Sequence, residues 1–155
     1  MAKKKWIGFD PGKSGAMCVL HEDNTVELYD FAKGGIPLYA KNMPKKGVVA
    51  VGLEKVHAMP GQGVTSMFSF GQRLGELEGM LATLEVGYDM PTPQKWQRAL
   101  NISKKGVKTT KKDIHAVISK IYPQAELLGS RGGIMDGRCD ALAIAHYMKT
   151  HYVKE

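Results

Sequence analysis

The chain has 155 residues, 43% of them hydrophobic and 24% charged, which suits a protein with one hydrophobic core. No apolar run approaches the roughly 20 residues of a membrane-spanning helix, and the lysine-rich N-terminus lacks the apolar stretch of a signal peptide. The net charge of +7 favours an anionic partner, of which nucleic acid is the commonest, although a merely soluble basic protein can carry the same charge. We expect one domain over residues 1–155 with no membrane contact. The two cysteines, Cys18 and Cys139, lack metal-ligand spacing, and we expect a reduced, cytosolic setting in which both are small core residues.

The first part of the chain predicts an antiparallel meander of three strands. Residues 6–10, 15–20 and 26–31 are mainly apolar. Residues 11–14 begin with Pro-Gly and predict the hairpin turn between the first two strands. The first strand ends at Asp10, a carboxylate that is costly to bury unless something pairs with it.

A second strand of this kind ends at Glu54. Residues 48–56 are apolar until this glutamate. Because side chains alternate along a strand, Gly52 shares a face with Glu54, as Gly8 does with Asp10. These small neighbours either leave room for a metal and a substrate above the sheet or merely ease the packing of a helix.

Residues 65–85 predict the longest helix. Its apolar face has spacings of three and four and consists of Met67, Phe70, Leu74, Leu77, Leu81 and Leu84. A second stripe has three glycines spaced by four, Gly71, Gly75 and Gly79. Each glycine costs a helix roughly 1 kcal/mol relative to alanine, so three on one face indicate the close approach of another backbone. That backbone belongs either to the protein's own sheet or to a partner subunit, and we expect a dimer interface.

The remaining segments alternate strands, helices and loops. They are a segment at 33–46 that is either a short helix or a loop, a short strand at 87–90, a helix capped by Thr92 that runs to about 100, a basic loop at 101–109, a helix capped by Thr110 that runs to 121, a glycine-rich loop at 128–134 and a last helix at about 135–150. This order predicts the α/β class, with a mixed five-stranded sheet flanked by helices. The sheet combines the antiparallel meander with parallel strands.

Four acids form the candidate catalytic site and are also the candidate metal ligands: Asp10, Glu54, Asp136 and Asp140. The last two lie four residues apart and so project from one face of the last helix. Grouped without a cation, these acids would repel one another and raise one another's pKa values. Two Mg²⁺ ions, or Mn²⁺ in their place, would remove that penalty and could orient a water for attack on a phosphodiester. Taken alone, Asp136 is better explained as a helix cap.

Basic residues gather in stretches that contain few acids. The candidate DNA-binding residues are Lys13, His57, Lys104, Lys105, Lys108, Lys111, Lys112 and Arg131. Patches of this kind usually hold phosphates without reading sequence. His57 follows Glu54 by three residues, where it either contacts DNA or is a surface residue without a role.

Two phosphate-binding patterns fit poorly. Gly12-Lys13-Ser14 resembles the end of a phosphate loop, but Gly8 is one residue too close and a strand follows where that motif requires a helix. The hairpin is also similar to the phosphate loop of actin-like sugar kinases, which need two such lobes where this chain has one.

Four motifs together resemble the RuvC-like Holliday junction resolvases, particularly the short versions encoded by phages. They are residues 7–12 (Ile-Gly-Phe-Asp-Pro-Gly), residues 54–63 with the following 66–71, residues 92–96 (Thr-Pro-Gln-Lys-Trp) and residues 136–143 (Asp-Gly-Arg-Cys-Asp-Ala-Leu-Ala). They occur in family order and cover most of the chain. The first motif alone is weak, and the four together are fairly specific.

The resemblance implies an RNase H-like fold and a homodimer that makes paired cuts in a four-way DNA junction, in the cytosol of a bacterium or a phage-infected host. It places Asp10, Glu54 and Asp140 as metal ligands. Asp136 stands near a position where members of the family have a histidine or an aspartate. Cellular members carry an aromatic wedge shortly after the glutamate, where this chain has His57.

Two other functions remain compatible with parts of the sequence. One is a module that binds branched DNA without cutting it, but such a binder gains nothing from acids that face phosphate. The other is a different RNase H-like nuclease, such as a ribonuclease or a transposase-type enzyme. The small size and the glycine-striped helix favour a compact dimeric resolvase over this second alternative.

Overall fold

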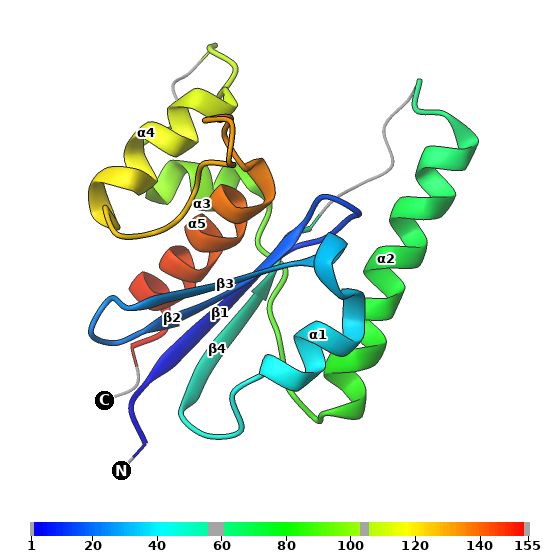
Figure 1. The fold of residues 1–155 in the computed structure, drawn as a ribbon, viewed down its shortest axis with the longest axis vertical. Coiled ribbons are helices and arrows are strands. Elements are labelled where there is room, and N and C mark those ends of the chain that lie inside the picture. The colour runs from blue at the N-terminus through cyan, green and yellow to red at the C-terminus, as the bar shows by residue number, and fades with distance from the viewer. Residues whose placement is uncertain (1, 56–60, 103–105, 154–155) are drawn as a thin grey trace.

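The computed structural model describes residues 2–55, 61–102 and 106–153, and its centre is a four-stranded sheet (Figure 1). The strands, in the spatial order β3-β2-β1-β4, are β3 (Val26–Asp30), β2 (Ala16–His21), β1 (Lys5–Asp10) and β4 (Val48–Leu53). The first three pair as an antiparallel meander, and β4 runs parallel to β1. The predicted mixed α/β sheet is therefore confirmed, except that it has four strands instead of five.

The predicted fifth strand at residues 87–90 is reduced to a single parallel bridge beside β4. Asp89 donates to the carbonyl oxygen of Val51 at 2.9 Å and accepts from the amide of Leu53 at 2.8 Å. In a parallel ladder the next donor would be the amide of Pro91, and proline has none. The ladder is therefore interrupted at Pro91, and residues 87–90 form a bridge instead of the expected strand.

Helices cover both faces of the sheet (Figure 1). One face carries α3 (Pro93–Ala99), α4 (Lys111–Ile121) and α5 (Asp136–His151), and the other carries α1 (Gly35–Asn42) and α2 (Val64–Thr83), with the short 3₁₀ helix η1 (Phe31–Lys33) just before α1. Each face has its own buried apolar cluster. The undecided segment at 33–46 thus contains a helix. Within the described ranges, no helix is both long and apolar enough to cross a bilayer.

Two glycines bring α5 close to the sheet. A Cβ atom on Gly8 would collide with the carbonyl oxygen of Ala141, and one on Gly52 would lie 2.8 Å from Cγ2 of Ile144. Both glycines therefore serve helix packing, and the idea that they leave room for a metal and a substrate above the sheet is wrong. Their effect on the site is indirect, because this close packing carries Asp140 of α5 to the sheet.

The long helix α2 differs from its prediction at both ends. It spans Val64–Thr83 instead of 65–85. Its C-terminal half buries Leu77 and Leu81, whereas Met67 and Leu84, at the two ends of the predicted apolar face, are exposed. The N-terminal end of α2 extends beyond the sheet (Figure 1), and residues 64–68 are all exposed.

Candidate metal centre

Three carboxylates from three elements converge at one end of the sheet. Asp10 is the last residue of β1, Glu54 directly follows β4, and Asp140 lies in the second turn of α5. One carboxylate oxygen from each lies within 4.8 Å of the others. The first two acids are neighbours because parallel strands end at the same edge of the sheet. A donor set made only of carboxylate oxygens is what Mg²⁺ and Mn²⁺ prefer, so these residues fit such an ion.

The negative charges of this cluster repel one another. Burial, followed by the negative charges of Asp140 and Glu54, raises the pKa of Asp10 well above its usual value. Burial, followed by the charges of Glu54 and Asp136, raises the pKa of Asp140 to about 7. Burial also raises the pKa of Glu54, although a hydrogen bond from Asp10 and the nearby indole N–H of Trp96 favour its charged form. The raised pKa of Asp10 favours its protonated form, and a divalent cation could take the place of that proton.

Asp136 stands outside the group of three. It is the first residue of α5, and the N-cap position belongs to Met135, so the helix-cap interpretation of Asp136 is wrong. Its side chain is 37% exposed and forms an ion pair with Lys111 at the start of α4. The structure therefore brings three of the four predicted acids together, and it places the fourth one turn of α5 before Asp140.

The described basic candidates are all exposed. Lys13 lies in the turn between β1 and β2, and Arg131 lies in the loop between α4 and α5. Lys108, Lys111 and Lys112 lie at or just before the start of α4. The remaining three, His57, Lys104 and Lys105, fall outside the described residues.

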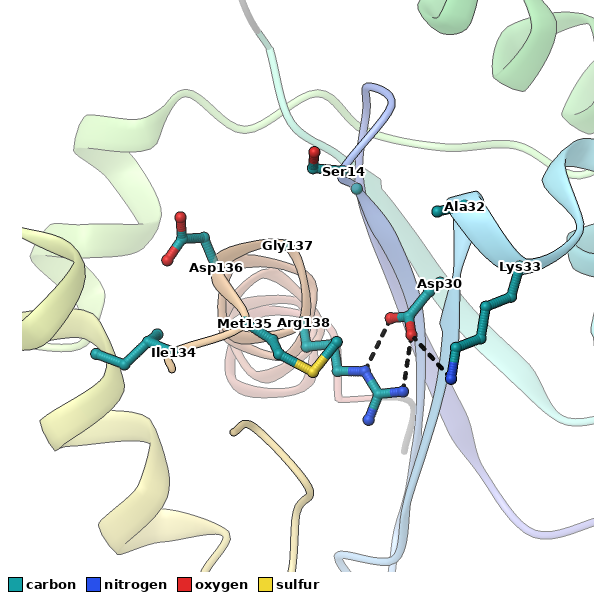
Figure 2. Close-up of a pocket in the computed structure, with 10 residues that line it drawn as sticks. Ser14, Asp30, Ala32, Lys33, Ile134, Met135, Asp136, Gly137 and Arg138 are labelled. Carbon is teal, nitrogen blue, oxygen red and sulfur yellow. Dashed lines mark hydrogen bonds and ion pairs between the residues drawn. The ribbon is translucent and has the colours of Figure 1, made fainter. Parts of the chain in front are cut away.

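A pocket of about 400 Å³ lies beside the N-terminus of α5 (Figure 2). Arg138 of α5 donates from Nε and Nη2 to the two carboxylate oxygens of Asp30 at 2.8 and 2.9 Å, and so ties α5 to the end of β3. Figure 2 shows Asp136 directed away from this pair, and Asp10, Glu54 and Asp140 do not line the pocket.

Sequence reasoning missed two interactions near the site. The partners Asp30 and Arg138 are separated by 108 positions, so no local pattern links them. Trp96 was noted only as part of a motif, although its indole acts on Glu54. The approach of a buried N–H to a carboxylate from another element has no signal in the spacing of residues.

Two solved structures have the same architecture as this chain. The structure of T. thermophilus RuvC in complex with Holliday junction substrate superposes with a TM-score of 0.63 at 14% sequence identity, covering 95% of each chain. The chain has the RuvC fold. A second Thermus thermophilus RuvC structure gives a TM-score of 0.56 at 14% identity, covering 93% of this chain and 94% of that one. No protein-family model and no curated protein matches the sequence. The RuvC-like resemblance is thus confirmed as a likeness of fold.

Proposed function

We propose that the chain is a divalent-metal-dependent endonuclease that hydrolyses phosphodiester bonds in four-way or branched DNA junctions, with residues 1–155 forming one nuclease domain. The observation that carries this proposal is the convergence of Asp10, Glu54 and Asp140 within 4.8 Å at the end of the sheet. The RuvC fold supports a junction as the substrate, because the similar T. thermophilus RuvC was solved with a Holliday junction substrate.

Each acid has a proposed role in this reaction. Asp10, Glu54 and Asp140 would hold two Mg²⁺ ions, with Asp136 as the fourth ligand. Bound Mg²⁺ supplies charge neutralisation at the phosphate and lowers the pKa of the attacking water. Because a water would attack the phosphate, the reaction needs no nucleophilic side chain.

The proposed DNA surface flanks this centre. The start of α4, the start of α5 and the ends of β1 and β4 lie at the same end of the molecule (Figure 1). Lys108, Lys111 and Lys112 are exposed there. The ion pair of Lys111 with Asp136 joins this surface directly to the acidic end of α5. Lysines in this position would hold the backbone phosphates around the scissile bond.

The proposed homodimer uses one face of α2. Gly71, Gly75 and Gly79 each have open space where a side chain would stand, which removes the alternative that they pack against the protein's own sheet. Val64 and Phe68, which continue the same face at helical spacing, are 84% and 74% exposed. A second copy would cover this apolar face, and a two-fold dimer would present two equivalent sites to the two strands that a resolvase must cut.

A comparison of substrates tests this function. The wild-type protein is incubated with Mg²⁺ and a four-way junction, a flap or an RNA–DNA hybrid of matched sequence. We expect cleavage of the four-way junction to be the fastest. Preferred cleavage of the hybrid would identify a ribonuclease-type enzyme, and tight junction binding without cleavage would identify a non-cleaving module.

A further inference from the structure

The buried indole of Trp96 lies behind the proposed metal centre. Trp96 belongs to α3 and is 1% exposed, in the apolar cluster beneath α5. Its Nε1–H is fully buried, and no acceptor in the described part of the chain meets it at normal hydrogen-bond distance and angle. Buried donors are nearly always paired in folded proteins, so this open donor requires an explanation.

The group that this N–H acts on is Glu54. The indole favours the charged form of the carboxylate, against the effect of burial on its pKa. Glu54 is itself 8% exposed and contributes one of the three converging oxygens. At the same time Glu54 takes a hydrogen bond from Asp10. The carboxylate of Glu54 is thus influenced by two donors, Asp10 and Trp96, and the indole N–H is the one that lacks normal hydrogen-bond geometry.

The backbone holds Trp96 and Glu54 in a fixed relation. The amide of Lys55, the residue after Glu54, donates to the carbonyl oxygen of Pro91 at 3.0 Å. Helix α3 begins directly after this hydrogen bond, because the side chain of Thr92 caps it by accepting from a backbone amide at 3.3 Å. The end of β4, which Glu54 follows, is therefore attached to the start of α3, which carries Trp96.

We propose that Trp96 is a positioning residue for the metal centre: its Nε1–H binds one oxygen of Glu54 and thereby presents the other oxygen to the divalent cation. This role rests on the proposed function, and Trp96 touches neither metal nor DNA in it. A carboxylate oriented in this way loses less freedom when it binds the cation. The loss of such an outer hydrogen bond typically weakens metal binding by about 10- to 100-fold.

The test uses Trp96→Phe, which keeps an aromatic ring in the core and removes the N–H. The chain supplies a matched control in its second tryptophan, Trp6, which is also buried and donates to the carbonyl oxygen of Tyr152 at 2.7 Å. Calorimetric titration with Mn²⁺ should give an affinity about 10- to 100-fold weaker for Trp96→Phe, and an unchanged affinity for Trp6→Phe. Equal affinities in the two variants would overturn the proposal.

A second substitution covers the case in which Trp96→Phe does not fold. Benzothienylalanine has the shape of tryptophan with sulfur in place of the N–H, and in the Trp6→Phe background it replaces tryptophan only at position 96. The same loss of Mn²⁺ affinity is expected, and the metal concentration for half-maximal junction cleavage should rise by the same factor. An unchanged affinity would overturn the role of the N–H. A wild-type protein that binds no Mn²⁺ would overturn the metal centre itself and this role with it.

Discussion

At the scale of single residues, the site is an arrangement of acids that repel one another when ionised. Asp10 is strongly affected, because burial and three neighbouring carboxylates raise its pKa. A divalent cation relieves both the repulsion and the cost of burial. We therefore expect substitution of an acid in the cluster to affect metal binding more than the stability of the fold.

The first prediction concerns Asp10→Asn. The amide keeps the shape of the side chain but is a poor metal ligand, so junction cleavage should fall to background while junction binding is kept or becomes tighter. Asp23→Asn is a suitable control, because Asp23 is an exposed acid that accepts hydrogen bonds from Thr25. A gel shift and a cleavage assay on the same junction report both effects. Normal cleavage by the Asn variant would remove Asp10 from the metal site.

The second prediction concerns pH. The pKa of Asp140 rises from 3.8 to about 7 on folding, so the folded state holds a proton that the unfolded chain releases. With EDTA present, this group's stabilisation is complete below about pH 4 and is lost as pH rises toward about 7. Melting temperatures across this range should therefore fall less steeply with pH for Asp140→Asn than for the wild type. Parallel curves for the two proteins would show that Asp140 does not titrate in this way.

The positions of the acids could be predicted from the sequence, but the residues that pack or interact around them could not. Asp10 and Glu54 can be located because each ends an apolar run, and Asp140 because it interrupts one in a helix. The role of Gly8 was wrongly assigned, since nothing in a strand pattern tells which helix will pack on it. The interaction of Trp96 with Glu54 depends on the path between two elements, and this path is fixed by tertiary hydrogen bonds.

At the scale of elements, the start of α4 is the part of the proposed DNA surface that can be tested apart from the metal. Lys108 and Lys112 are exposed beside Lys111, the partner of Asp136. Replacing both with glutamine should lower the slope of log K against log salt by roughly 0.9 for each phosphate that the variant no longer neutralises. Junction binding measured at several salt concentrations gives this slope.

The control for these lysines is a matched pair at the opposite end of the sheet. Lys45 and Lys46 lie directly before β4, at the end of the strand remote from Glu54. Replacing both with glutamine removes the same charge and should leave the slope unchanged. Equal slopes for the two double variants would mean that only net charge matters, and that α4 binds no phosphate specifically.

The elements themselves were predictable to different degrees. The meander, β4 and the helices after residue 90 follow from apolar period and from the caps Thr92 and Thr110, both of which accept the expected amide. The prediction of a fifth strand was wrong because Pro91 has no N–H to donate to β4. The sequence does not show this, since it does not reveal that β4 is the neighbouring strand. The apolar period of α2 continues past its buried half, so the pattern alone does not tell which of its residues the core covers.

At the scale of the whole molecule, the proposal requires two copies of the site. Gly75→Leu places a large side chain on the open stripe of α2 and should give a folded monomer that nicks junctions but rarely makes paired cuts. Sedimentation with circular dichroism measures the assembly and the fold together. Ser66→Leu is the control, because Ser66 is exposed on another face of α2. A dimer that survives Gly75→Leu, or a monomeric wild type, would remove α2 from the interface.

The central claim is a metal-dependent nuclease that makes paired cuts in a junction, and a plasmid with an extruded cruciform tests it most directly. Paired cuts across the cruciform convert the supercoiled plasmid to a linear product in one binding event, whereas single cuts give a relaxed circle. We predict linear product with Mg²⁺, none with EDTA, and none from a plasmid without the cruciform. Linear product in EDTA, or equal cleavage of the plasmid that lacks the cruciform, would contradict this account.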